Sequence, residues 1–214
     1  MSDGWYQSYV AALRDGDRRR ALAVVDAAQT AGLDLTSLYL GVFQPALRDI
    51  GRLWQENAIT VAEEHLATAI TQIAMGKLYM DFCSPVIPNG RTMLAACGSD
   101  ERHELGLRMV CDLLELEGWD VRFLGAAVPD DGLVAMVLEY RPHALALSAS
   151  IAPHLPPLRA TIARVRAACG EATPYIVVGG RPFLDDDALA QRVGADAMGR
   201  DAAEAASLLR ERFP

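Results

Sequence analysis

Cysteine is scarce in this sequence, and the cysteines it has form no paired motif. Cys83, Cys97, Cys111 and Cys169 are the only four among 214 residues. No two of them have the C-x-x-C spacing that is typical of zinc sites and redox-active dithiols. Three of the four lie in apolar surroundings, so we interpret them as reduced, buried thiols of a cytoplasmic protein. A small domain held together by disulfides is thereby excluded.

Long hydrophobic runs and an excess of positive charge are also absent. No apolar run approaches the ~20 residues that a membrane span requires, and the N-terminus lacks the basic-then-apolar character of a signal peptide. We therefore expect a soluble protein with no membrane contact. The chain has 20 Lys and Arg against 28 Asp and Glu, a net charge of −8. That balance argues against direct nucleic-acid binding, which needs a basic face to neutralise phosphates.

The first 83 residues carry helical periodicity without strand-like alternation, and they predict a four-helix bundle. One helix places Trp5 and Leu13 on one face, and a second follows from Asp17. The third is expected over residues 35–56, where Pro45 should bend it or mark an offset. The fourth runs from the capping box Thr60-Val61-Ala62-Glu63 to about Phe82. Residues 84–90 contain two prolines and an Asn-Gly turn, so we place the domain linker there.

Beyond the linker, residues 91–214 alternate between short apolar runs and helical segments, which predicts a parallel sheet covered on both faces. Residues 144–147 and 176–178 are apolar without a break, as in central strands. Asp120 and Arg122 alternate with apolar residues, as in an edge strand. A flavodoxin-like, Rossmann-like order 2-1-3-4-5 would bring the carboxyl ends of strands one, three and four together. The five strands are expected near 91–98, 119–125, 143–149, 174–179 and 195–198, each followed by a helix.

A candidate ligand site follows the first predicted strand, in the segment Glu101-Arg102-His103-Glu104-Leu105-Gly106. Ligands of open α/β sheets bind at this carboxyl edge. A neutral imidazole at His103 can coordinate a metal through one nitrogen while Glu101, two residues upstream, holds the other N–H and raises the ligand basicity. Gly106 would let backbone or a cofactor approach closely. A solvated surface pair is the alternative interpretation of Glu101 and His103.

Three segments together resemble the cobalamin-binding domain family. They are E-x-H-x-x-G at 101–106, Ser148-Ala149-Ser150 and Gly179-Gly180, against that family's D-x-H-x-x-G, S-x-L and G-G. The resemblance implies that His103 is the lower axial ligand of cobalt. It also implies that the displaced nucleotide tail runs beside the serines and glycines. Glu101 and Ser150 depart from the pattern, and neither departure should abolish binding. The cofactor-binding candidates in this domain are Glu101, Arg102, His103, Gly106, Ser148, Ser150, Gly179 and Gly180.

The predicted bundle carries a second motif, Trp54 followed after nine residues by Glu64-His65. A short reversal at residues 57–59 would bring these side chains to one end of the bundle. Packing explains a tryptophan at a helix end equally well, and the helix dipole favours a glutamate near a helix start. Both interpretations remain open on these residues alone.

W-x(9)-E-H directly before a cobalamin-binding domain resembles the CarH-type light-responsive regulators, which are cobalamin-dependent photoreceptors. The resemblance implies that the bundle, residues 1–83, caps adenosylcobalamin. Trp54 would pack on the adenosine, Glu64 would hydrogen-bond it, and His65 would stand over the upper face as a possible cobalt ligand after light. Related receptors have a histidine after the tryptophan, where this chain has Gln55. The sequence begins almost at the bundle, without their DNA-binding domain, so direct operator binding is not expected.

Two functions follow from these resemblances. The first is a light sensor without catalytic activity that acts by self-association or through a separate DNA-binding regulator. The second is a corrinoid methyl carrier of a methyltransferase system, with methylcobalamin or hydroxocobalamin bound. W-x(9)-E-H favours the sensor, because a methyl ligand needs no aromatic and carboxylate cradle. A receiver or nucleotide-binding domain is disfavoured, because the first strand is not followed by G-x-G-x-x-G or a P-loop.

Two further histidines lie outside these motifs. His143 precedes the third predicted strand, at the edge opposite the candidate site, and we expect it on the surface. His154 lies between Pro153 and the Pro156-Pro157 pair. It could line the tail slot or cap the next helix, but a surface position is the expectation for it as well.

Overall fold

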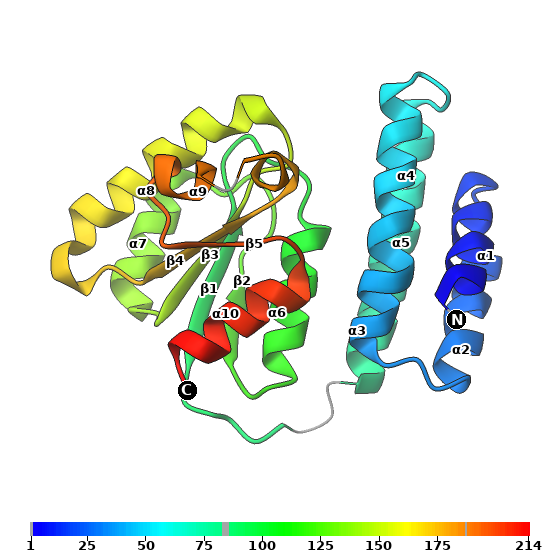
Figure 1. Cartoon of the computed structure of the whole chain (residues 1–214), viewed down its shortest axis with the longest axis horizontal. Helices are drawn as coiled ribbons and strands as arrows, with labels where there is room; N and C mark the ends of the chain where they lie inside the picture. The colour runs from blue at the N-terminus through cyan, green and yellow to red at the C-terminus, as the bar shows by residue number, and fades with distance from the viewer. Residues whose placement is uncertain (1, 83–85, 187) are drawn as a thin grey trace. The chain divides into compact units, whose positions relative to one another are not determined.

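The computed structural model describes residues 2–82, 86–186 and 188–214. The chain divides into two compact units, Met1–Ser84 and Pro85–Pro214, which are described separately (Figure 1). Cys83 and the first two residues of the predicted linker, 84 and 85, lie outside the described residues. Residues 86–91 form no helix or strand.

The first unit contains the four predicted helical segments. Its regular helices are α1 (Ser2–Arg14), α2 (Arg18–Thr30), α3 (Leu35–Leu38), α4 (Gln44–Gln55) and α5 (Val61–Phe82). The third predicted helix is interrupted by a π-helical turn at Tyr39–Phe43, where the Gln44 N–H donates to the Tyr39 carbonyl. Pro45 follows at once and has no N–H to donate to the carbonyl four residues earlier. The expected offset at Pro45 is therefore confirmed.

Aromatic side chains fill the centre of the bundle. The ring of Phe43 lies 4.9 Å from that of Tyr9 and 5.9 Å from that of Tyr39, centroid to centroid. Tyr9 is fully buried, and its hydroxyl donates to the Thr71 hydroxyl at 3.1 Å. The hydroxyl of Tyr9 therefore has the hydrogen-bond partner that a buried hydroxyl requires.

Helix α5 begins with the predicted capping box. The Thr60 N–H donates to the Glu63 carboxylate at 2.7 Å, and the Glu63 N–H donates to the Thr60 hydroxyl at 3.2 Å. One face of α5 is buried in the bundle through Ala67, Ile70, Thr71, Ala74, Met75 and Leu78. Leu66, Ile73 and Met80 recur every seven residues along another face, and they are exposed.

The second unit is a five-stranded parallel sheet in the order β2-β1-β3-β4-β5, which confirms the predicted fold and topology. The apolar stretches 144–147 and 176–178 lie in the interior strands, as predicted. The strands are β1 (Thr92–Cys97), β2 (Asp120–Phe123), β3 (Ala144–Ser148), β4 (Tyr175–Gly179) and β5 (Ala197–Gly199). Cys97 pairs with Ser148, and Ser148 pairs with Gly179, so three carboxyl ends are level at one edge.

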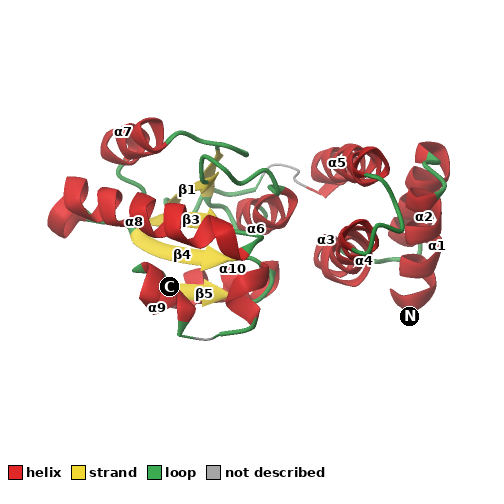
Figure 2. Cartoon of the chain, turned by 90° about the horizontal axis from the view of Figure 1, so that it is seen from above, coloured by secondary structure: helices red, strands yellow, loops and turns green. Residues whose placement is uncertain are grey.

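Helices cover both faces of this sheet. On one face α6 (Leu105–Glu115) packs against α10 (Ala202–Arg212). On the other lie α7 (Asp130–Tyr140), α8 (Leu155–Cys169) and α9 (Leu189–Val193) (Figure 2). Between these helices and the sheet is a core made mostly of leucine, isoleucine and valine side chains. Short 3-10 turns occupy Ala152–His154, Gly170–Ala172 and Arg181–Leu184.

The described cysteines are free thiols. Cys97 and Cys111 are buried and Cys169 is half-buried. Burial, together with the nearby Glu101 and Glu104 charges, raises the pKa of Cys97 to about 12. None of the described helices is both long enough and apolar enough to span a lipid bilayer.

Candidate functional site

The loop between β1 and α6 places a buried carboxylate under an exposed histidine. Glu101 is 1% exposed, whereas the side chain of His103 is 54% exposed. Oε1 of Glu101 lies 2.6 Å from Nδ1 of His103 and accepts the His103 backbone N–H at 2.8 Å. The side chain and the backbone of His103 are thus both fixed by one carboxylate oxygen.

The other oxygen of Glu101 is bound by the loop that follows β3. Oε2 accepts the Ser150 backbone N–H at 2.5 Å and lies 2.9 Å from Nδ1 of His154. The side chain of His154 is only 18% exposed, so the predicted surface position is wrong. The imidazole is drawn inward because a buried carboxylate must be compensated by donors.

These contacts determine the charge of Glu101 and the tautomers of its two histidines. Burial raises the pKa of Glu101, but hydrogen bonds from the His103 and His154 side chains and from the His103 and Ser150 backbones outweigh it, and the pKa falls to about 2. The ionised carboxylate only accepts hydrogen bonds, so both Nδ1 atoms must donate. A neutral His103 therefore carries its ring lone pair on Nε2, which is the form that binds metals.

Two glycines near this edge, Gly180 and Gly106, have different surroundings: the backbone conformation requires glycine at the first, and the second lies beside open space. Gly180 has φ +115°, and a Cβ there would collide with the Ala149 carbonyl. Gly106 lies in the first turn of α6, is exposed, and has no atom within 4 Å of where a Cβ would be. Ser148 and Gly179 are register partners at the strand ends, and the Ala149 N–H donates to the Gly179 carbonyl at 3.0 Å.

The remaining predicted residues of this unit are on the surface. Arg102 is exposed. His143 is exposed as predicted, before β3, and its Nδ1 accepts the Thr92 N–H at 3.1 Å. In the parts of the chain that the structure describes, no three or more His, Cys, Asp and Glu side chains are grouped as metal ligands.

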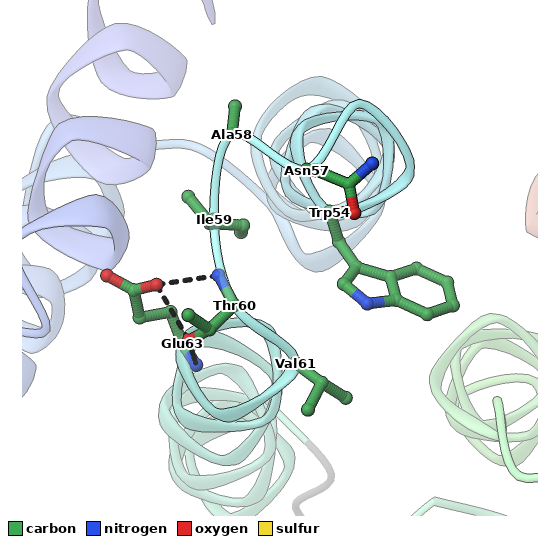
Figure 3. A pocket seen from close by; sticks show the side chains of 7 residues that line it. All are labelled: Trp54, Asn57, Ala58, Ile59, Thr60, Val61 and Glu63. Atoms are coloured by element: carbon green, nitrogen blue, oxygen red, sulfur yellow. Dashed lines mark hydrogen bonds between the residues drawn. The ribbon is translucent and has the colours of Figure 1, made fainter.

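In the bundle, Trp54 lines a pocket of about 400 Å³ at the hairpin between α4 and α5. Trp54 is 41% exposed, and its indole points to the same side of the hairpin as Val61 (Figure 3). Glu63 points to the opposite side, where it binds Thr60. The residues that line the pocket are Trp54, Asn57, Ala58, Ile59, Thr60, Val61 and Glu63. Glu64 and His65 follow them on α5 and are not part of this lining.

Glu64 and His65 repeat the carboxylate–imidazole arrangement of the α/β unit. Oε2 of Glu64 lies 2.5 Å from Nδ1 of His65, and Oε1 accepts the Thr68 hydroxyl at 2.9 Å. The Glu64 side chain is 16% exposed and that of His65 is 75% exposed. Sequence reasoning missed Thr68, although its position four residues after Glu64 on one helix face is a usable signal.

A parallel α/β unit with a carboxylate-anchored histidine at its carboxyl edge, preceded in the chain by a helical bundle, defines a class of cofactor-binding protein. Family comparison identifies the class: the chain belongs to the B12 binding domain family. Residues 91–209 match one description of a B12 binding domain, and residues 5–79 match a second.

Individual relatives are of two kinds. The chain is 29% identical over 192 residues to the HTH-type transcriptional repressor CarH of Myxococcus xanthus, covering 90% of this chain but only 62% of CarH. It is 23% identical over 206 residues to trimethylamine corrinoid protein 1 of Methanosarcina acetivorans, covering 93% of this chain and 92% of that protein. The structure of the Methanosarcina barkeri monomethylamine corrinoid protein shares the fold, with a TM-score of 0.86, 17% identity and full coverage of both chains.

The geometry of the α/β unit fits cobalamin. An exposed imidazole with its lone pair on Nε2 suits a metal that takes one axial protein ligand. Gly106, in the first turn of α6, has open space where a Cβ would be. His103 would hold the cobalt, and the edge formed by Ser148 and Gly179 would contact the rest of the cofactor.

Proposed function

We propose that this protein is a light-sensing regulatory module that uses adenosylcobalamin. His103 would ligate cobalt from the lower face, while Glu101 holds its Nδ1–H. Trp54, Glu64 and His65 would surround the adenosyl group on the upper face. Its output would be regulatory, and it would catalyse no reaction on an outside substrate. The proposal includes a location in the cytoplasm.

The observation that carries this proposal is the exposed aromatic and the anchored imidazole at one end of the bundle. Trp54 is 41% exposed, and His65 is 75% exposed beside a largely buried Glu64. An aromatic plane suits an adenine ring, and a carboxylate accepts from ribose hydroxyls. Glu64 retains acceptor capacity beyond His65 and Thr68, because a carboxylate has about four lone-pair sites. A methyl ligand has no use for these groups.

Cobalamin, when bound, supplies the cobalt–carbon bond that light breaks. The residues of the chain supply the switch. A ligand can change a protein only through contacts that differ between two states, and contacts of Trp54 and Glu64 with the adenosyl group would exist only before illumination. His65, with Nδ1 directed at Glu64, would present Nε2 to cobalt afterwards. Gln55 is not an imidazole and would leave that role to His65.

The net charge of −8 disfavours a nucleic-acid partner for this chain. A separate DNA-binding regulator, or a second copy of the chain, is the partner that the proposal includes. The chain aligns with about three fifths of CarH, which is described as an HTH-type repressor, so this part of the proposal rests on that relative.

A corrinoid methyl carrier is the second candidate function, and one observation favours it. The chain matches 92% of the length of the trimethylamine corrinoid protein, against 62% of CarH. In this alternative His103 would keep its role as the lower ligand, and methylcobalamin would be the working form. Trp54 and His65 would then have no ligand to cradle.

The test compares adenosylcobalamin with methylcobalamin in the dark and after green light. We expect tight binding of the adenosyl form and a rapid, lasting spectral change on illumination. Trp54→Ala should weaken adenosylcobalamin binding and leave hydroxocobalamin binding unchanged, whereas Trp5→Ala is the matched control. Equal affinity for both alkyl forms, with no effect of Trp54→Ala, would favour the carrier instead.

A further inference from the structure

We propose that residues 87–91, at the end of the linker, form a clamp on the turn between α6 and β2, and that this clamp shortens the connection between the two units of the chain. The structural part of the proposal stands on contacts within the α/β unit alone. Its consequence for ligand binding rests on the proposed function, in which both units contact adenosylcobalamin. The clamp would raise the affinity for that ligand without contacting it.

Asn89 is the centre of the clamp, because its backbone and its side chain both bind the turn. The Asn89 N–H donates to the Gly118 carbonyl at 2.8 Å, and Nδ2 donates to the Glu117 carbonyl at 2.9 Å. Oδ1 accepts the Arg91 N–H at 2.9 Å. The amide group thus uses its donor side on the turn and its acceptor side on the linker. Asn89 is exposed, so these contacts fix the position of the linker and fill no core.

Gly118 lets the linker approach the turn closely. It has φ +88°, and a Cβ there would lie 2.3 Å from the Ile87 carbonyl oxygen and 3.1 Å from the Asn89 nitrogen. Glycine is the residue that permits both this backbone conformation and this approach. Ile87 is itself 87% exposed. The linker is therefore held through its backbone and not through burial of its apolar side chain.

The turn that receives the linker is fixed from the side of the last helix. The Glu117 carboxylate pairs with Arg210 of α10 at 2.6 Å. Trp119, which is 5% exposed, packs edge-on against Phe213, with the ring centroids 5.7 Å apart. Because α10 holds the turn at both Glu117 and Trp119, the clamp is attached to a fixed part of the α/β unit.

The clamp determines how many residues connect the two units. Helix α5 ends at Phe82, so residues 83–86 lie between this helix and the clamp. The Asp120 N–H donates to the Arg91 carbonyl at 2.8 Å next to the β1–β2 pairing, so an open clamp would release the linker only as far as residue 90. The connection would then double in length, from residues 83–86 to residues 83–90.

A longer connection weakens the binding of any ligand that both units hold. The entropic cost of closing a loop grows with the logarithm of its length, so doubling the connection lowers the effective concentration of one unit at the other about threefold. Adenosylcobalamin should therefore bind about threefold less tightly when the clamp is open. A ligand held by the α/β unit alone should bind equally well in both states.

Two substitutions open the clamp by independent routes. Asn89→Asp keeps Oδ1 for the Arg91 N–H but puts an oxygen in place of the donor to the Glu117 carbonyl. Gly118→Ala leaves Asn89 intact and displaces the Ile87 carbonyl. Gly32→Ala is the matched control for Gly118→Ala, because Gly32 has φ +91° and no atom within 4 Å of a Cβ. It introduces similar backbone strain in the bundle and does not touch the linker.

The first measurement is amide hydrogen exchange at single residues in the full chain without cofactor. The amide of residue 89 should be protected in the parent chain and in Gly32→Ala, and much less protected in Asn89→Asp and Gly118→Ala. The amide of Leu94, in the buried strand β1, should stay protected in all four proteins if the α/β unit remains folded. An unprotected Asn89 in the parent chain, or equal protection of residue 89 in all four proteins, would overturn the clamp.

The second measurement compares the dissociation constants of adenosylcobalamin and methylcobalamin in the dark. The adenosyl form should bind more tightly to the parent chain and to Gly32→Ala, and this advantage should shrink about threefold in the two clamp variants. Because both ligands are compared in the same protein, a change within the α/β unit itself cancels. An undiminished advantage in both clamp variants would overturn the consequence for binding. Equal binding of both forms to the parent chain would instead refute the proposed function, and protection at residue 89 would still decide the clamp.

Discussion

At the scale of residues, the candidate site depends on one buried carboxylate. Glu101 makes two contacts with His103 and one each with Ser150 and His154, in a position 1% exposed to solvent. Such a group is costly to bury unless its donors are complete. Substitution of Glu101 should therefore affect mainly stability, whereas substitution of His103 should affect mainly ligand binding.

His103→Ala tests the ligand without disturbing the fold. The side chain is 54% exposed, and Oε1 of Glu101 keeps the backbone N–H of residue 103. Because the variant also removes one donor from the buried Glu101 carboxylate, we expect the unfolding free energy to fall by about 1–3 kcal/mol with the fold retained. The imidazole-bound cobalamin spectrum should be lost completely. His143→Ala removes another exposed histidine and should keep that spectrum. An unchanged spectrum in His103→Ala would reject the ligand assignment.

Glu101 should make the apo protein sensitive to acid. Its pKa is about 2 in the folded chain, against an ordinary value of 4.5. A lowered folded-state pKa contributes stability above pH 4.5, and this contribution disappears as the pH falls toward 2. The shift corresponds to roughly 3 kcal/mol.

Glu101→Gln provides the comparison. The amide presents a donor where the native site has only donors, so we expect a loss of about 1–3 kcal/mol at neutral pH. The stability gap between the two proteins should narrow below pH 4.5, because only the parent chain loses the charge. Chemical denaturation measured at several pH values would reveal it. A gap that stays constant down to pH 2.5 would contradict the role given to the Glu101 charge.

Of the contacts in this cluster, only the one between Glu101 and His103 could be predicted from the sequence. Glu101 and His103 are two residues apart in a loop, so their contact follows from spacing. His154 lies 53 positions from Glu101, and nothing in its own neighbourhood, rich in proline, indicates a buried partner. Only the pairing of β1 with β3 brings these two loops together. The contact is a product of topology, which residue patterns determine only indirectly.

At the scale of elements, substitution of two glycines by alanine should have opposite effects on the stability of the apo protein. Gly106 is in the first turn of α6 with open space at its Cβ position, so Gly106→Ala should stabilise the apo protein by up to ~1 kcal/mol through helix propensity. If the cofactor occupies this space, the same change should weaken cobalamin binding. Thermal unfolding and cobalamin titration measure the two effects. Unchanged affinity would remove Gly106 from the binding site.

Gly180→Ala is the matched contrast. The positive φ and the approach to the Ala149 carbonyl leave no room for a methyl group, so the loop after β4 must shift. We expect a loss of stability in the apo protein, in contrast to Gly106→Ala. Equal or higher stability would mean that the backbone at Gly180 relaxes without cost.

The start of α5 depends on its capping box. Thr60→Ala removes the acceptor for the Glu63 N–H and should cost about 1 kcal/mol. Without this cap, the first turn of α5 should fray. The fraying would lie beside the pocket at Trp54, which Thr60 and Glu63 also line. Amide hydrogen exchange at residue 63 should be faster in Thr60→Ala and close to normal in Thr60→Ser, which keeps the hydroxyl. Equal exchange in both variants would contradict the cap.

Elements were more predictable than single contacts, for a physical reason. Apolar runs and helical stripes reflect burial, and burial is what selects strands such as β3 and β4. The π-helical turn before Pro45 was predicted only as an offset. Its type depends on how Tyr39 and Phe43 pack against Tyr9, and periodicity does not carry that information.

At the scale of the whole molecule, topology was predictable and function only by resemblance. The edge position of β2 and the interior positions of β3 and β4 follow from which strands alternate and which are apolar throughout, whereas the full order 2-1-3-4-5 was predicted from the likeness to a flavodoxin-like sheet. The upper-face roles of Trp54, Glu64 and His65 stay predictions, because they concern a ligand and a second unit of the chain. What the structure of the bundle itself shows is that Trp54 and His65 are exposed.

Illumination should change the assembly of the protein if the upper-face proposal holds. Exposed apolar side chains at Leu66, Ile73 and Met80 follow one stripe of α5, so their burial would favour association by the hydrophobic effect. Removal of the adenosyl group would alter contacts at Trp54, on the adjoining helix end. We therefore expect the mass from light scattering to differ between the dark, adenosylcobalamin-bound chain and the same sample after green light. Methylcobalamin in the His103→Ala chain should give no such difference. A monomer mass in both conditions would mean that the output of the sensor does not pass through self-association.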